Sequence, residues 1–143
     1  MNVTLKNLIG QCVYKNKDKE PVGKIKGVCF SPEGDKISSV AVESLSLIPL
    51  SRTVPIGEIS GIGNKKLILQ SDVSISRGQD KLLGDKGLKA VCINGRYGKI
   101  KDMKFDFETG EITDITIVKG AFARGEKIIV NKMYIKENTI YIE

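Results

Sequence analysis

The acidic side chains that could do chemistry gather in one short stretch of the C-terminal half. Asp102, Asp106 and Glu108 stand close together in the sequence, and Asp114 follows them. Carboxylates serve as general acids or bases, and several converging oxygens bind hard cations. Carboxylates around a hairpin also form turns and caps. The stretch therefore leaves a weak cation site at Asp106 and Glu108 open beside a purely structural role.

Histidine is absent from the sequence, which narrows the available chemistry. A Ser-His-Asp triad, a Cys-His dyad and a histidine metal ligand are all excluded. The three cysteines, Cys12, Cys29 and Cys92, form no C-x-x-C pair, and the last two stand in apolar runs. We interpret them first as buried inert thiols and second as redox or metal groups.

These features predict that the chain is not an enzyme and has no catalytic residue, metal or cofactor. An enzyme stays open as a third interpretation if a deep pocket holds Asp102, Asp106 and a lysine together, because such pockets perturb ionisable groups. The odd number of cysteines indicates a reducing compartment.

Lysines form the most regular charged pattern. Lys24 and Lys26 flank one isoleucine, and Lys99 and Lys101 flank another. Side chains two residues apart on a strand project from the same face. With 23 basic and 17 acidic side chains, the net charge is +6. The two basic faces predict contact with RNA phosphates or with an acidic protein, and the alternative is that these lysines only protect a sheet edge.

An apolar segment in the first half is a candidate contact surface. Residues 45–50 read LSLIPL and include Leu47, Ile48 and Leu50. The segment either continues a strand into the core or forms an interface with the other half or with a partner.

A second candidate loop lies in the other half. Residues 120–125 read GAFARG, so glycines flank Phe122 and Arg124. Aromatic and arginine side chains are enriched at binding hot spots. The alternative is a hairpin tip with the Phe122 ring folded onto the domain. Both loops are predicted to contact a protein partner.

The elements that position these residues occur twice in the chain. The stretch 22–30 is similar to 97–105, and the similarity continues on both sides. Two copies of one unit account for all 143 residues. We predict two domains, 1–72 and 76–143, separated in the polar stretch 70–79.

Each copy has the pattern of a small β-domain. Residues 36–42 and 111–117 alternate between polar and β-branched side chains, and turn residues precede them, which predicts a hairpin in each copy. The strand before each turn has an irregular apolar spacing, which predicts a β-bulge at Gly27 and at Asp102.

A bulge bends a strand and lets a small sheet close on itself. We therefore predict an all-β fold of two tandem small SH3-like antiparallel β-barrels. One helical turn is expected to lead into each barrel, within 2–9 and 79–83.

The two copies resemble the PRC-barrel family in their glycines, turn residues and core aliphatics. The segments that carry the resemblance are GQCVY at 10–14, GKIKGV at 23–28, FSPEG at 30–34, VPIGEISGIG at 54–63, GKIKD at 98–102 and ETGEI at 108–112. The second copy departs from the pattern at 130–135, where the proline and glycines are missing.

The resemblance implies a small barrel used as an interaction module. Barrels of this kind occur in the cytoplasmic domain of the photosynthetic reaction-centre H subunit and in the C-terminal domain of the ribosome maturation factor. No catalytic residue is implied by the family.

We expect a non-enzymatic scaffold or adaptor that binds a protein partner through barrel loops and strand faces. The alternative is a ribosome- or RNA-associated accessory factor that binds through its lysine-rich faces. Four Tyr, four Phe and no Trp argue against a base-stacking platform. No apolar stretch approaches the ~18 residues of a membrane span. The first residues contain no apolar h-region, so a secretory signal is not expected. A cytoplasmic location is expected.

Overall fold

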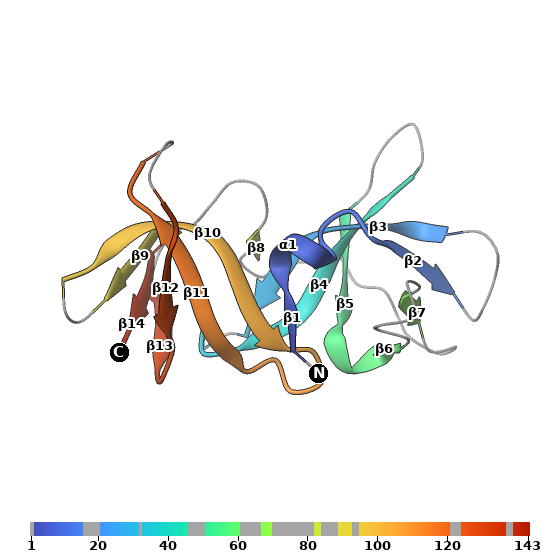
Figure 1. The fold of residues 1–143 in the computed structure, drawn as a ribbon. Helices are drawn as coiled ribbons and strands as arrows, with labels where there is room; N and C mark the ends of the chain where they lie inside the picture. Colours follow the sequence, from blue (N-terminus) through green and yellow to red (C-terminus); the bar gives the residue numbers. More distant parts are fainter. Residues whose placement is uncertain are drawn as a thin grey trace.

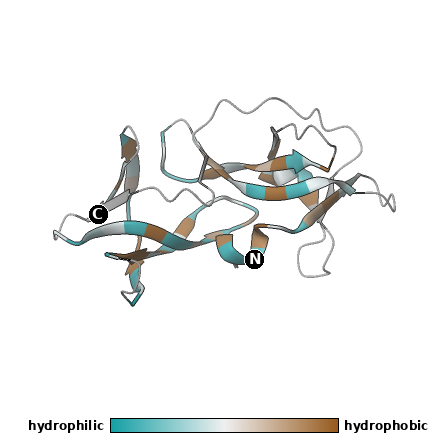
Figure 2. Ribbon diagram, turned by 90° about the horizontal axis from the view of Figure 1, so that it is seen from above, coloured by the Kyte–Doolittle hydropathy of each residue, from teal (hydrophilic) through white to brown (hydrophobic). Residues whose placement is uncertain are grey.

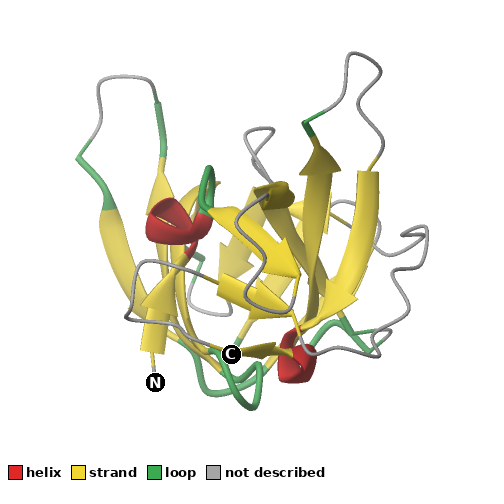
Figure 3. Cartoon of the chain, turned by 90° about the vertical axis from the view of Figure 1, so that its right-hand side faces the viewer, coloured by secondary structure: helices red, strands yellow, loops and turns green. Residues whose placement is uncertain are grey.

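The chain folds as an all-β protein in the computed structural model. The structure describes residues 2–15, 21–31, 33–45, 51–60, 67–69, 82–83, 89–92, 95–120, 124–136 and 139–143. Within these residues the helical segments are α1 (Leu5–Leu8) and the single 3₁₀ turn η1 (Ile56–Glu58), and strands make up most of the rest (Figure 3). The predicted all-β class is confirmed.

The first half builds one curled sheet with the strand order β5-β4-β3-β2-β7-β6, and β8 joins it beside β3 (Figure 1). Its strands are β2 (Cys12–Lys15), β3 (Pro21–Phe30), β4 (Ile37–Ser44), β5 (Ser51–Pro55), β6 (Ile59–Ser60), β7 (Leu67–Leu69) and β8 (Leu82–Leu83).

The second half repeats this order as β12-β11-β10-β9-β14-β13, and β1 joins it beside β10. Its strands are β1 (Asn2–Thr4), β9 (Lys89–Cys92), β10 (Tyr97–Asp106), β11 (Ile112–Val118), β12 (Glu126–Ile129), β13 (Met133–Lys136) and β14 (Thr139–Ile142). The same path traced twice agrees with the duplicated sequence pattern.

One pair of strands in each sheet is parallel, which differs from the fully antiparallel prediction. The pairs are β2 with β7 and β9 with β14. In the first sheet β5 and β6 run in the same direction and count as one passage, so β2, β3, β4, β5–β6 and β7 make five alternating passages. The first strand, β2, and the last, β7, therefore run in the same direction, and the same holds for β9 and β14. When they become neighbours, they must therefore pair in parallel.

The two ends of each sheet path are consecutive in the chain. η1 alone separates β5 from β6, and residues 130–132 alone separate β12 from β13. Because a three-residue link spans only about 10 Å even when extended, the end strands stay close together. This short link explains why each sheet curls.

Both long strands contain the predicted bulge, but one residue earlier than predicted. The register of each ladder skips one residue, Lys26 in β3 and Lys101 in β10, whereas Gly27 and Asp102 are paired. The bulged residue needs no ladder partner, so a lysine can occupy it. The hairpins β3–β4 and β10–β11 that follow the bulges are confirmed.

The segments that precede the two halves are exchanged between them. β1 pairs with β10, where Val3 lies opposite Phe105. β8 pairs with β3, where Leu83 lies opposite Val28. β1, α1 and β8 consequently lie in the middle of the molecule (Figure 1). The helical turn predicted within 2–9 is confirmed, whereas Leu82–Leu83 is a strand because β3 supplies its hydrogen-bond partners.

The hairpin turns also meet across the middle of the molecule. Lys36 and Glu111 form an isolated β-bridge, and the amide of Ile37 donates to the carbonyl oxygen of Gly110 at 2.8 Å. Gly110 has a φ of +82°, and a Cβ there would overlap the carbonyl oxygen of Ile37. The close approach and the left-handed backbone both require glycine here.

The turn of the first half makes the reciprocal contact. Gly34 has a φ of +73°, and a Cβ there would lie 2.7 Å from the amide nitrogen of Ile135 in β13. Each hairpin turn therefore packs against the other half through its glycine.

Buried side chains of both halves form one continuous core. Val28 and Phe30 from β3 join Met103 and Phe105 from β10, and each is at most 2% exposed. Hydrophobic and hydrophilic residues alternate along the strands (Figure 2), as expected for sheets with one buried face. The division into domains 1–72 and 76–143 stays a prediction, because each sheet also holds a strand from beyond that boundary.

Candidate functional site

Asp102, the first of the acidic residues, caps the helical turn. Its Oδ1 accepts hydrogen bonds from the backbone amide of Lys6 at 3.0 Å and from that of Met103 at 2.8 Å. Thr4 Oγ1 accepts from the next amide of α1, that of Asn7, at 3.3 Å. Two of the amides that a helix start leaves without a backbone partner are thus satisfied. The arrangement favours the structural role of Asp102.

Asp106 forms the hairpin turn in the same way. Its Oδ1 accepts from the amides of Thr109 at 3.0 Å and Glu108 at 2.8 Å. These two backbone hydrogen bonds, that from Thr109 first, hold the pKa of the Asp106 carboxyl below its ordinary value of 3.8. Among the described residues, no group of three Asp, Glu, Cys or His side chains could hold a metal ion. The geometry favours the turn-forming role over the cation site.

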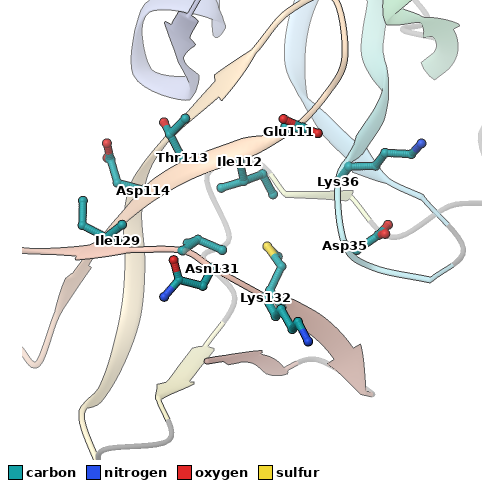
Figure 4. Close-up of a pocket in the computed structure, with 11 residues that line it drawn as sticks. Asp35, Lys36, Glu111, Ile112, Thr113, Asp114, Ile129, Asn131 and Lys132 are labelled. Carbon is teal, nitrogen blue, oxygen red and sulfur yellow. The ribbon is translucent and has the colours of Figure 1, made fainter.

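A groove of about 890 Å³ lies where the two hairpin turns meet (Figure 4). It is lined by side chains from both halves: Asp35, Lys36, Glu111, Ile112, Thr113, Asp114, Ile129, Val130, Asn131, Lys132 and Met133. Asp35 accepts a hydrogen bond from the Ser31 hydroxyl at 2.8 Å. Neither Asp102 nor Asp106 lines this groove, so it is not the pocket that the enzyme interpretation requires. Its mixed lining fits a seam between two docked turns.

The predicted basic residues lie on both sheets. Lys24 is exposed and Lys26 half-buried in β3, whereas Lys99 and Lys101 are both exposed in β10. Each pair thus stays a candidate surface.

The predicted loop residues are only partly described. Arg124 is exposed. Phe122, Leu47, Ile48 and Leu50 lie outside the described residues. Leu45, the described residue of the apolar segment, is 52% exposed. The two loops remain predictions.

Three of the four tyrosines come together on one face of the second sheet. The backbone register pairs Tyr97 with Val91, Val91 with Tyr141, and Tyr141 with Tyr134. Residues that lie opposite one another in a ladder share a face of the sheet. Tyr97, Tyr141 and Tyr134 therefore form one row across β10, β9, β14 and β13, which we name the tyrosine row.

The tyrosine row is open to solvent. Tyr97 is 60% exposed and Tyr134 is 51% exposed. The rings of Tyr134 and Tyr141 are stacked, with centroids 5.0 Å apart and planes inclined by 15°. The Nζ of Lys119 lies 5.3 Å from the centroid of the Tyr97 ring, in the geometry of a cation–π contact. The row thus offers aromatic surface with a positive charge beside it.

A row of basic positions runs next to the tyrosine row. Lys99 and Lys136 are two residues further along β10 and β13 than Tyr97 and Tyr134, so they lie on the same face. The register connects them through Lys89 and Thr139. Lys99 and Lys136 are both exposed. The predicted basic residue Lys99 is thereby joined to an aromatic surface that the sequence analysis missed.

The sequence contained part of the signal for this row. Tyr134 and Tyr141 are equally distant from residues 137–138 in the sequence, and the antiparallel register of β13 with β14 places them opposite each other. Tyr97 joins them only because β9 lies between β10 and β14. Counting aromatic residues along the chain therefore underestimated their clustering in space.

Comparison with known proteins finds no family model that matches the chain and no curated protein that is similar to it. Within the described part of the chain, no helix has the length and apolar character needed to cross a membrane.

Proposed function

We propose that the chain is a non-enzymatic interaction module, built from two barrels of the PRC type, that binds a macromolecular partner through the tyrosine row. The carrying observation is the exposure of Tyr97 and Tyr134 in one row with Tyr141. Tyrosine is enriched at binding surfaces because a large rigid ring contributes contact area at low entropic cost.

The barrel part of the proposal is supported by the topology. The two end strands of each sheet, β5 and β6 or β12 and β13, are consecutive in the chain. The first and last strands of each path along the chain, β2 and β7 or β9 and β14, are paired with each other. This arrangement is typical of a five-stranded sheet that closes on itself, since closure pairs the first strand with the last. The 3₁₀ turn η1 interrupts the strand that returns to the start of the first sheet.

The exposed aromatic surface supports the proposed binding role. The stacked pair of Tyr134 and Tyr141 is fixed by neighbouring strands, so little ordering is needed when a partner binds. A protein partner held by Leu47, Ile48, Leu50, Phe122 or Arg124 remains a second expectation.

Retention of partners from a lysate of the cells that make the protein tests this proposal. The full chain, a Tyr97→Leu/Tyr134→Leu variant and a Tyr14→Leu variant are each immobilised. Tyr14 is the matched control, because it lies in the corresponding row of the first sheet. Circular dichroism and thermal unfolding first establish that all three proteins are folded.

We expect the wild-type chain and Tyr14→Leu to retain the same macromolecule and the double variant to lose it. If the folded double variant retains everything that the wild type retains, the tyrosine row is not the binding surface and the proposal is wrong.

A further inference from the structure

We infer that the partner of the tyrosine row is a single-stranded nucleic acid whose bases stack on the rings and whose phosphates meet the adjacent lysines. The inference rests on the proposed function and gives its partner a chemical class. It is carried by the placement of exposed rings and exposed lysines in neighbouring rows of one sheet face.

The aromatic part of the surface suits bases. The row spans three strand spacings from Tyr97 to Tyr134, which is about 14 Å. Single-stranded nucleic acids are bound by rings on an open sheet, where two or three successive bases stack, and stacking tolerates any sequence because every base has a π-face. The Tyr134 and Tyr141 rings, with centroids 5.0 Å apart, already form part of such a platform.

The charged part of the surface suits a phosphate backbone. Lys99 and Lys136 mark the two ends of the neighbouring row, and both are exposed. Lys119 adds a third ammonium group, 5.3 Å from the centre of the Tyr97 ring. A nucleic-acid strand lying across the sheet would thus meet aromatic rings along one row and lysine ammonium groups along the neighbouring row.

The same composition disfavours a protein as the occupant. Tyrosine is common in protein interfaces, but lysine is depleted there because its hydrated ammonium group and flexible stem are costly to immobilise. Phosphate contacts avoid part of this cost, since the released counterions contribute favourably to binding. Rings combined with lysines therefore point to a nucleic acid.

Fluorescence anisotropy of fluorescein-labelled ten-nucleotide oligouridylate and oligothymidylate, titrated with the full chain at 50 and 200 mM salt, tests the inference. We expect binding of both probes, weakened at least tenfold in Tyr97→Leu/Tyr134→Leu and less than twofold in Tyr14→Leu. The conservative pair Tyr97→Phe/Tyr134→Phe keeps the stacking surface and should bind within about threefold of the wild type.

The lysines give an independent readout. For a single strand, each phosphate contact contributes about 0.7 to the slope of log affinity against log salt. Lys99→Gln and Lys136→Gln should each lower that slope by about this amount, while Lys24→Gln, at the corresponding position of the first sheet, should leave it unchanged.

Two results overturn the inference, and they differ from failure of the proposed function. Equal binding of the probes by the wild type and the double variant, or no binding by the wild type, removes the nucleic acid. If a protein is then retained from nuclease-treated lysate by the wild type and lost by the double variant, the tyrosine row binds a protein and only the inference fails. If nothing depends on the row in either experiment, both fail.

Discussion

The two halves of the molecule share their scaffold and differ in one exposed row. Both sheets have the same strand order, the same bulge before the hairpin and a glycine in the docked turn. In the first sheet the corresponding row contains Ser60, Ile68, Tyr14 and Pro21. That row contains one tyrosine, whereas the row of the second sheet contains three. The comparison indicates that both halves need the residues that dock them together, whereas the proposed binding row of three tyrosines belongs to the second half.

The largest loss of stability is expected at Gly110 and Gly34, the glycines through which each hairpin turn packs against the other half. Gly110→Ala must adopt a left-handed backbone, at about 1–2 kcal/mol, and also overlaps Ile37, which adds about 1–3 kcal/mol. Gly34→Ala should lose a similar amount against Ile135. Urea unfolding of the full chain measures both losses.

Gly10 and Gly95 are the matched controls. Their φ angles are +91° and +90°, but a Cβ at either position meets no atom within 4 Å. Alanine there should cost only the backbone term of about 1–2 kcal/mol. Equal losses for all four variants would show that the turns do not dock as described.

A smaller loss of stability is expected at Asp102, a position at which the two halves differ. Asp102 caps α1 through the amide of Lys6, whereas its counterpart in the first half is Gly27. Asp102→Ala should therefore lower the free energy of unfolding by about 1 kcal/mol. Thermal and urea unfolding give this difference. The exposed Glu33, replaced by alanine, is the control and should change stability by less than about 0.5 kcal/mol, and an equal loss there would contradict the capping role.

The ring pair of the tyrosine row gives a comparable energy. A double-mutant cycle with Tyr134→Leu and Tyr141→Leu should yield a coupling of about 1 kcal/mol, the usual contribution of a stacked pair. In a second cycle, Tyr97→Leu and Tyr141→Leu should couple by less than about 0.5 kcal/mol, because Val91 separates the two tyrosines in the row. Equal couplings in the two cycles would contradict the described ring geometry.

The smallest effect concerns the dependence of stability on pH. Backbone hydrogen bonds lower the pKa of Asp106 below 3.8 in the folded state. Its ionised form therefore stabilises the fold above about pH 4, and this contribution is lost as the pH falls through the lowered pKa. The stability difference between the wild type and Asp106→Asn should shrink as the pH falls from about 5 to below 3.8.

The exposed Glu108, changed to glutamine, controls for the loss of one charge in that pH series. Asp106 has Ser31 as its counterpart in the first turn, so this contribution belongs to the second half alone. Wild-type and Asp106→Asn stabilities that fall in parallel with pH would contradict the assigned hydrogen bonds.

Local patterns along the chain were sufficient to predict the central hairpin of each sheet, β3–β4 and β10–β11. The irregular apolar spacing before each turn located the bulge to within one residue, at Lys26 and Lys101 rather than at Gly27 and Asp102. Spacing reveals that an extra residue exists, but ladder hydrogen bonds decide which residue is left out.

Contacts between distant parts of the chain were not predictable in this way. The pairing of Val3 with Phe105 joins residues that no local periodicity relates. The helical turn expected near Leu82–Leu83 became a strand because the first sheet offered it a partner. The tyrosine row was missed for the same reason, since sheet order brings Tyr97 to Tyr141.

The exchange of β1 and β8 makes each half incomplete by itself. A fragment that ends before the second copy carries β1, whose partner lies in β10, and exposes the edge of β3 that β8 covers in the intact chain. The fragment that contains the second copy carries β8 and exposes the edge of β10 that β1 covers in the intact chain. Because an open strand edge is a template for another strand, two separately produced fragments are complementary and should reassemble on mixing. During synthesis, β1 must wait until residues 104–106 have been made before it finds its place.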